Sequence, residues 1–333
     1  GGRSSMKKAA AVFLALALVF SLSACGKMIP EDLAPKGDAS NIKAQLLYKA
    51  APEKASAFLS QKASSPASML RDESASAKEP SFSEVVAVDN DKCLIKITGI
   101  DPDSTWGYTL KTELENRSSD KTYMFCVKSA SINGVQTEPL SATEVAAGKK
   151  ANDEINFLSQ DLEENDIGDY TDIEMTFRVY DSEDWSADDI AEETVHVYPY
   201  GKENASKFVR EPQATDQILV DNDTLTVVLT GYSQDDIWGY SANLFLQNKS
   251  DKNLMISVDD CSVNDIMCDP YYAATLAPGK CCFSSITWSN NTLEENGISS
   301  IENIEFELSV TDYDDWFADP YCEEKITLTP DFS

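Results

Sequence analysis

The chain has 333 residues and carries 57 Asp and Glu against 27 Lys and Arg, which gives a formal net charge of −30. The charge is concentrated in two regions: residues 84–199 hold 26 acidic and 9 basic side chains, and residues 217–333 hold 21 and 4. Surfaces this acidic repel nucleic acid and anionic lipid headgroups, so we expect no nucleic-acid partner. The acidity favours either simple solubility or a basic partner.

The chain from Met6 begins with the pattern of a signal peptide. Lys7 and Lys8 precede an uncharged, mostly apolar run from Ala9 to Ala24, shorter than the ~20 residues that span a bilayer. No later segment is apolar enough to span, so we expect no transmembrane helix. Residues 1–24 are therefore predicted to be a signal peptide, with residues 1–5 as a remnant before its start.

The end of this run carries the most specific short motif. Leu22-Ser23-Ala24-Cys25, followed by Gly26, resembles the lipobox of bacterial lipoproteins. The resemblance implies cleavage before Cys25 and a diacylglycerol on its sulfur, and two acyl chains meet the requirement for stable anchoring. We therefore expect an extracytoplasmic protein held to the bacterial cell membrane through Cys25. The alternative is an ordinary secretory signal with a cysteine here by chance.

Two segments have the composition of linkers. Residues 25–83, which follow the signal peptide, are rich in Ala, Ser, Lys and Pro and nearly neutral, which predicts a flexible stalk. Residues 200–216 form a second linker.

The regions between and after these linkers, residues 84–199 and 217–333, are two copies of one sequence. Asp89-Asn90-Asp91 recurs as Asp221-Asn222-Asp223 at an offset of 132, and beyond Ser119 the offset is 131. A near-gapless repeat of this length predicts two copies of one domain.

Apolar residues in each copy have period two, which predicts strands with one buried face. About seven strands in ~115 residues are typical of an immunoglobulin-like sandwich. The predicted fold class is therefore all-β, with two tandem immunoglobulin-like β-sandwich domains. Within the copies, the one helical expectation is a single turn, capped by Asp161 in the first copy and Thr292 in the second.

Several short motifs recur in both copies: a Trp-Gly-Tyr strand, a Leu-Glu-Glu-Asn turn and a closing Asp-Trp. With the Asn-Gly turn of the first copy and a Gly-Lys before a strand, this arrangement resembles the uncharacterised Ig-like domains of lipoproteins from Firmicutes. The resemblance covers both repeats and implies a fold and a surface location. Such families carry no established catalytic residues, so it implies none here.

The chain has eight cysteines, and lipidation of Cys25 would leave an odd number that cannot all pair. None recurs between the copies, so a shared disulfide bridging the sandwich is not expected. Cys93 stands where the second copy has Leu225, which predicts a small buried apolar residue. A bridge between Cys261 and Cys268 stays open. Metal binding by cysteine is disfavoured, because the chain has no CxxC spacing.

An enzyme is not expected. His196 is the only histidine, and its place between Val195 and Val197 predicts that it faces away from the core. Thr327 replaces it in the second copy. No GxSxG nucleophile motif accompanies it, and pairs of carboxylates are too common in this chain to be informative.

Two groups of residues are candidate binding sites. The first is acidic and falls in equivalent loops, where hard oxygen ligands suit Ca²⁺ and no other cofactor is expected. The DxDxDG pattern is missing, so a solvated acidic loop is the alternative. The residues are Asp181, Glu183, Asp184, Asp188 and Asp189 in the first copy, and Asp312, Asp314, Asp315 and Asp319 in the second.

The second group is aromatic, and exposed aromatic rings beside carboxylates would suit stacking against sugar rings. The alternation along the strands predicts that these side chains point inward, and they are present in both copies. Both observations favour core residues instead. The residues are Trp106, Tyr108, Trp185, Trp238, Tyr240 and Trp316.

The sequence therefore predicts a non-catalytic, lipid-anchored cell-surface protein that acts by binding or presentation through two acidic domains. Tandem domains allow two-site engagement of one partner. The alternatives are a Ca²⁺-stabilised adhesin and a carbohydrate-binding surface lipoprotein. The expected ligand is a protein or glycan that the sequence does not identify.

Overall fold

A computed structural model describes residues 80–330 apart from residues 105–106, 158–166, 185, 237, 271 and 316. The predictions for the signal peptide, Cys25 and the stalk up to residue 79 lie outside the described residues. The described chain divides into two compact units. Residues 80–130 and 138–206 belong to the first, and residues 131–137 and 207–330 to the second.

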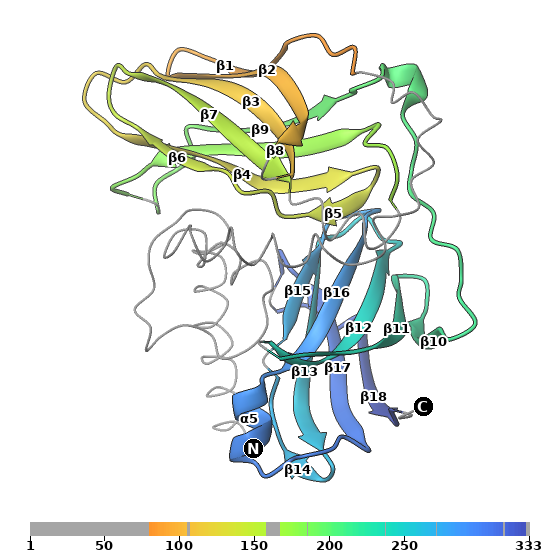
Figure 1. The fold of residues 1–333 in the computed structure, drawn as a ribbon. Coiled ribbons are helices and arrows are strands. Elements are labelled where there is room, and N and C mark those ends of the chain that lie inside the picture. The colour runs from red at the N-terminus through yellow and green to blue at the C-terminus, as the bar shows by residue number, and fades with distance from the viewer. Residues whose placement is uncertain are drawn as a thin grey trace. The chain divides into compact units, whose positions relative to one another are not determined.

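The first unit is built from two layers of strands (Figure 1). One sheet has the order β1 (Val85–Asp89), β2 (Cys93–Ser104), β3 (Gly107–Asn116) and β7 (Lys150–Phe157). The other joins β4 (Tyr123–Ile132), β8 (Ile173–Asp181) and β9 (Ala191–Val197), with β6 (Ala142–Val145) paired to β4. A short 3₁₀ turn, η3, follows at Lys202–Asn204.

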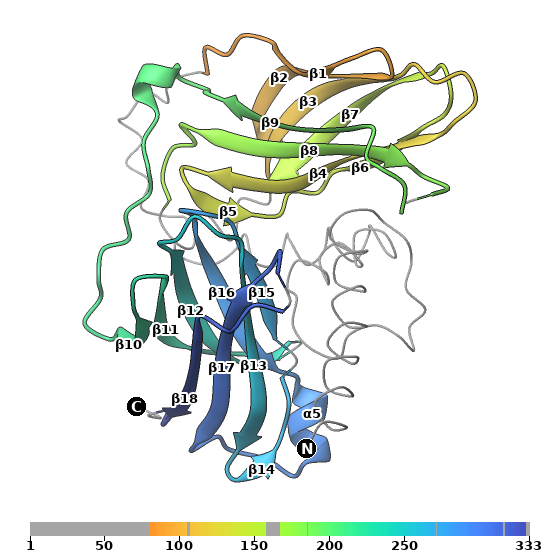
Figure 2. The same ribbon diagram turned by 180° about the vertical axis from the view of Figure 1, so that it is seen from behind.

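The second unit has the same two layers, seen from behind in Figure 2. One sheet has the order β10 (Gln217–Asp221), β11 (Leu225–Asp235), β12 (Gly239–Asn248) and β16 (Cys281–Trp288). The other has the order β14 (Ile266–Met267), β13 (Leu254–Val263), β17 (Ile304–Asp312) and β18 (Cys322–Leu328), with β15 (Ala273–Leu276) paired to β13. The second unit also contains the short helix α5 (Asn290–Glu295). The strand β5 (Val135–Thr137) belongs to this unit as well.

The predicted all-β, sandwich-like fold class is confirmed. Corresponding strands of the two units begin 132 or 131 residues apart, as β3 and β12 or β8 and β17 do. The period-two pattern marks the buried faces: Cys93, Ile95 and Ile97 are fully buried in β2. Apolar side chains from both sheets thus meet in the core of each unit. Among the helices of the described residues, none is long and apolar enough to cross a membrane.

The helical turn in the second unit differs from its prediction. The N-cap of α5 is Ser289, whose side chain accepts a hydrogen bond from the backbone N–H of Thr292. Thr292 is therefore inside the helix and was wrongly predicted as the cap. Both are cap-forming residue types, and the end of β16 at Trp288 decides between them. The equivalent turn at Asp161 lies outside the described residues.

Each unit has a β-bulge in its edge strand. The register of β1 against β2 shifts between Val86 and Val88, and that of β10 against β11 shifts between Ile218 and Val220. Val86 and Ile218, at the start of the two shifts, are 50% and 64% exposed. The bulge is therefore part of the shared fold of both units.

Strands β3 and β12 each end in a buried asparagine that holds the following loops by hydrogen bonds. Asn248 is 2% exposed, and its Nδ2 donates to the carbonyl oxygens of Lys252, Leu276 and Ala277 at 2.7, 2.9 and 3.0 Å. Its Oδ1 accepts from the backbone N–H and the hydroxyl of Ser250. Asn116 has the same place in the first unit. One polar side chain thus satisfies several backbone groups inside each sandwich.

Candidate functional site

The acidic loop of the first unit is held by its own hydrogen bonds. Asp181 is 7% exposed and accepts from Lys121 Nζ at 2.7 Å and from the backbone N–H of Glu183 at 3.1 Å. The ammonium of Lys121 is the main reason that the pKa of Asp181 lies below its ordinary value. Asp184 accepts from Ser186, and Asp189 pairs with Arg178 at 2.8 Å. Asp181, Asp184 and Asp189 are therefore engaged in turns and ion pairs.

The acidic loop of the second unit is organised in the same way. Asp312 is 7% exposed, and its Oδ1 accepts from the backbone N–H of Asp314 at 2.9 Å. That hydrogen bond is the main reason for the lowered pKa of Asp312. The Tyr321 hydroxyl donates to Asp312 Oδ2 at 3.0 Å, and Asn253 donates to Asp314 at 2.7 Å. Tyr321 thus provides the donor that Lys121 provides in the first unit.

These carboxylates do not converge on a shared point. Within the part of the chain that the structure describes, no group of three His, Cys, Asp or Glu side chains is arranged to hold a metal ion. Glu183, Asp188, Asp315 and Asp319 are exposed. The Ca²⁺ site stays a prediction that these contacts do not support.

The aromatic candidates divide into two groups. Tyr108 and Tyr240 are each 7% exposed, in agreement with their inward parity, and Trp238 is half-buried. Trp106, Trp185 and Trp316 lie outside the described residues. The Tyr108 hydroxyl is buried and, among the described residues, has no hydrogen-bond partner. Burial raises the pKa of both tyrosines, that of Tyr240 to about 12.

His196 lies on β9 and faces away from the core, as predicted. Its Nδ1 is 2.7 Å from Asp172 Oδ1, and its Nε2 is 3.6 Å from Glu174 Oε2. The ring stacks on Tyr198 with centroids 5.5 Å apart. The histidine thus lies beside two carboxylates on the surface of the first unit.

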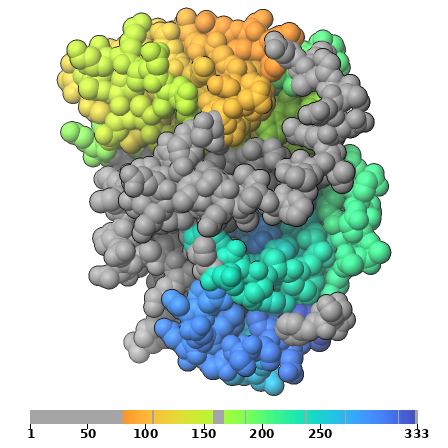
Figure 3. Space-filling model, viewed as in Figure 1, coloured from red at the N-terminus to blue at the C-terminus, as the bar shows by residue number. Residues whose placement is uncertain are grey.

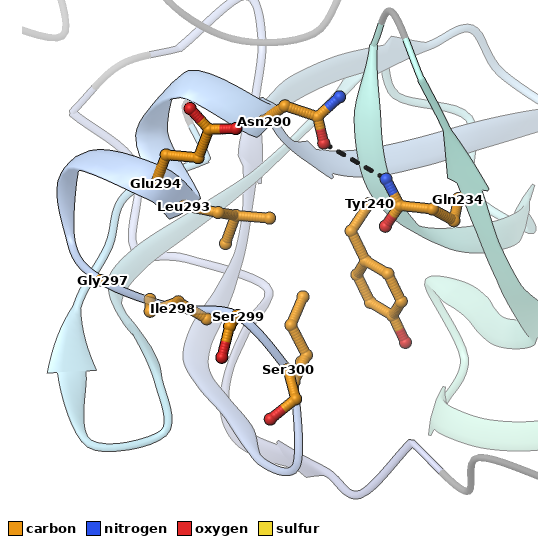
Figure 4. A pocket seen from close by; sticks show the side chains of 10 residues that line it. Gln234, Tyr240, Asn290, Leu293, Glu294, Gly297, Ile298, Ser299 and Ser300 are labelled. Atoms are coloured by element: carbon orange, nitrogen blue, oxygen red, sulfur yellow. Dashed lines mark hydrogen bonds between the residues drawn. The ribbon is translucent and has the colours of Figure 1, made fainter.

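A cleft lies beside Tyr240 in the second unit. It has a volume of about 580 Å³ and lies between Gln234 and Tyr240 on one side and residues 290–301 on the other. Figure 4 shows Tyr240 opposite Leu293 and Ser300. In the space-filling view, the blue segment that contains α5 adjoins the teal strands β11 and β12 (Figure 3). We call it the Tyr240 cleft.

The walls of the Tyr240 cleft are set by a close backbone approach. Gly239 has φ 111°, and a Cβ there would lie 2.1 Å from the Trp288 carbonyl oxygen and 2.9 Å from the Asn290 nitrogen. Only glycine allows β12 to begin so close to the end of β16. Asn290 then donates to the carbonyl oxygens of Asp235 and Asp236, which fixes α5 against the β11–β12 loop.

The Tyr240 cleft has an apolar wall and a polar rim. Leu293, Ile298 and Ile301 are 7%, 8% and 4% exposed and form the wall with the Tyr240 ring. At the rim, Gln234 Nε2 donates to Asn290 Oδ1 at 3.2 Å, a bond drawn in Figure 4. The exposed side chains of Glu294, Ser299 and Ser300 complete the rim.

The Tyr240 hydroxyl is the unusual polar group of this cleft. Tyr240 stacks on Tyr232 with ring centroids 5.8 Å apart. No group in the described part of the chain hydrogen-bonds its hydroxyl, and this oxygen, unlike that of Tyr108, is accessible to solvent. A ligand or a water molecule in the cleft would satisfy it.

The first unit has a different side chain at the same place. Tyr170 stands where the second unit has Ile301, and its ring lies 4.6 Å from that of Tyr108 between centroids. Tyr108 is the equivalent of Tyr240. Next to this tyrosine, the first unit therefore has an aromatic ring where the second unit has a smaller aliphatic side chain.

Sequence reasoning identified Tyr240 but missed the rest of the Tyr240 cleft. Its other wall residues follow the Leu-Glu-Glu-Asn turn, which the sequence marks only as a helical turn. The replacement of Tyr170 by Ile301 was visible in the aligned copies. This replacement was the one feature of the sequence that indicated a difference in cavity size between the two units.

No family model matches the chain, and no curated protein matches it. Among solved structures, it is similar to the Amycolatopsis orientalis exo-chitosanase CsxA, at 13% identity over 72% of this chain and 26% of that one, with a TM-score of 0.21. It is also similar to red sea bream transglutaminase, at 10% identity over 76% and 31% of the two chains, with a TM-score of 0.18. The chain thus spans less than a third of either protein, and TM-scores this low carry no argument.

Proposed function

We propose that the chain is a non-catalytic, lipid-anchored protein of the bacterial cell surface that binds a ligand through the Tyr240 cleft. The observation that carries the proposal is the cleft itself, where an apolar wall lies beside Tyr240, whose accessible hydroxyl has no hydrogen-bond partner among the described residues. The lipobox at Cys25 supports the anchoring, and the tandem acidic sandwiches support presentation away from the membrane.

The residues of the Tyr240 cleft support binding over catalysis. Apart from Tyr240, its one ionisable lining residue is Glu294, which is exposed. General acid–base catalysis uses positioned groups whose pKa lies near the working pH. Burial moves the pKa of Tyr240 to about 12, away from that range. The cleft therefore has groups that can hold a ligand but no pair suited to proton transfer.

Anchoring is tested with Cys25→Ser in the full chain expressed in a Gram-positive host. We expect the unaltered protein in the membrane fraction with incorporated lipid, and the variant without lipid in the medium or unprocessed. Cys93→Ala is the matched control, because Cys93 is a buried core thiol. Lipid on the Cys25→Ser variant would refute the anchor.

Binding is tested by thermal shift with a panel of neutral, anionic and cationic small molecules. The variant Leu293→Trp fills the Tyr240 cleft. A compound that raises the Tm of the unaltered protein but not of this variant supports the proposal. If no compound does so, or if both proteins respond equally, the cleft is not a binding site.

A further inference from the structure

We propose that the Tyr240 cleft binds a neutral saccharide ring, which lies against the apolar wall and hydrogen-bonds the Tyr240 hydroxyl. This inference rests on the proposed binding function and names the chemical class of the ligand. Three features of the cleft carry it: its charge, its apolar wall and its hydrogen-bonding groups.

The charge of the second unit disfavours an anionic ligand. Residues 217–333 hold 21 acidic side chains against 4 basic ones, so an anion would approach against a repulsive field. A cation would need carboxylates within the cleft, and Glu294 on the rim is the only one that lines it. A neutral ligand fits these charges.

The apolar wall matches the C–H face of a pyranose. Leu293, Ile298 and Ile301 present aliphatic groups, and the Tyr240 ring lies across the cleft from Leu293 (Figure 4). A volume of about 580 Å³ lies within the usual range for small-molecule sites, roughly 300–1,000 Å³. The cleft is therefore large enough for one or two sugar rings.

The polar groups match the hydroxyls of a sugar, which both donate and accept hydrogen bonds. The Tyr240 hydroxyl lacks a partner among the described residues. The Gln234 amide nitrogen is already engaged with Asn290 Oδ1 and the Asp235 carbonyl oxygen, which leaves its Oε1 as an acceptor toward a ligand. The hydroxyls of Ser299 and Ser300 add further donors and acceptors at the rim.

The first unit provides a built-in comparison. Tyr170 contacts Tyr108 where Ile301 stands near Tyr240. We therefore assign saccharide binding to the second unit alone, and exchanging these two residues tests the assignment.

The test measures binding by calorimetry and protein-observed NMR, with the full extracytoplasmic chain and a defined panel. The panel holds neutral di- to tetrasaccharides of glucose, N-acetylglucosamine, galactose and mannose. A uronic-acid disaccharide and a choline-like quaternary amine are included as charged probes. We expect at least one neutral saccharide to bind and the charged probes not to bind.

The variants locate the site. Tyr240→Phe removes only the hydroxyl and should weaken binding about five- to tenfold, the effect of one lost hydrogen bond. Ile301→Tyr introduces the first unit's residue and should abolish binding. Tyr108→Phe is the matched control and should bind like the unaltered protein. Circular dichroism establishes that each variant is folded, and Ser300→Ala on the exposed rim gives a second reading if Ile301→Tyr unfolds.

Each outcome decides one point. Binding of the quaternary amine without any neutral saccharide would overturn the ligand class and leave the cleft as a binding site. Saccharide binding that is unchanged in Tyr240→Phe and Ile301→Tyr would overturn the site. If no probe binds and the broader thermal-shift panel is also negative, the proposed binding function fails together with the inference.

Discussion

The buried Asn248 gives the sharpest test of how the second unit is stabilised. In Asn248→Ala, the carbonyl oxygens of Lys252, Leu276 and Ala277 lose the donor that now lies 2.7 to 3.0 Å away. Ser250 loses the acceptor for its backbone N–H and its hydroxyl. The substitution removes these five bonds from a site where Asn248 is 2% exposed, although the Ala277 carbonyl oxygen keeps its hydrogen bond from the backbone N–H of Lys280.

The magnitude follows from the number of bonds. Each neutral hydrogen bond contributes about 0.5–1.5 kcal/mol net, and a buried group left without a partner costs about 1–3 kcal/mol. We expect Asn248→Ala to lower the free energy of unfolding of the second unit by about 3–5 kcal/mol. Asn116 bonds the carbonyl oxygens of Lys121 and Val145 and the N–H of Ser118. With fewer bonds, Asn116→Ala should cost about 2–4 kcal/mol in the first unit.

The assay is urea unfolding followed by far-UV circular dichroism, with hydrogen-exchange mass spectrometry to assign each transition to a unit. Asn291→Ala, at an exposed position of α5, is the control and should change stability by less than about 0.5 kcal/mol. A cost below about 1 kcal/mol for Asn248→Ala would refute the reasoning. So would destabilisation of the other unit.

Gly239→Ala should destabilise the second unit by more than about 2 kcal/mol in urea, because a Cβ would collide with the Trp288 carbonyl oxygen; a neutral effect would contradict the close approach. Asp181→Asn should lower stability by an amount that is constant above about pH 5. The difference should begin to shrink near the ordinary pKa of 3.8 and vanish as the pH falls through the lowered pKa of folded Asp181, because its contacts stabilise the ionised form; a pH-independent difference would refute this. The seven described cysteines are free and buried, so none should react with Ellman's reagent at pH 8 until guanidinium unfolds the chain; fewer than seven reactive thiols after unfolding would reveal a disulfide.

Much of the fold was predictable because it depends on local pattern. Period-two burial identified the strands, as β2 and β11 show with Cys93 and Leu225 both fully buried. The helix cap was missed because Ser289 and Thr292 are both good cap residues three positions apart. The choice between them depends on the end of β16, which sequence pattern leaves uncertain by a few residues.

The Tyr240 cleft was not predictable as a whole. Its sides come from Gln234 and Tyr240 and from residues 290–301, far apart along the chain. Whether a space remains between them depends on the close approach at Gly239 and on the size of the side chain at Ile301. In the acidic loops, the sequence marked Asp181 and Asp312 as candidate Ca²⁺ ligands, with a solvated acidic loop as the alternative. In the structure both accept hydrogen bonds within their own loops.

The bulges in β1 and β10 have a consequence for a protein displayed at high density. A straight edge strand with exposed apolar residues is a template on which neighbouring molecules add strands and aggregate. Here the register is interrupted beside Val86 and Ile218, the exposed residues that would otherwise favour such pairing. If the chain is anchored to a membrane as we propose, crowded copies would therefore remain separate molecules, and the second sandwich would stay free to meet its ligand.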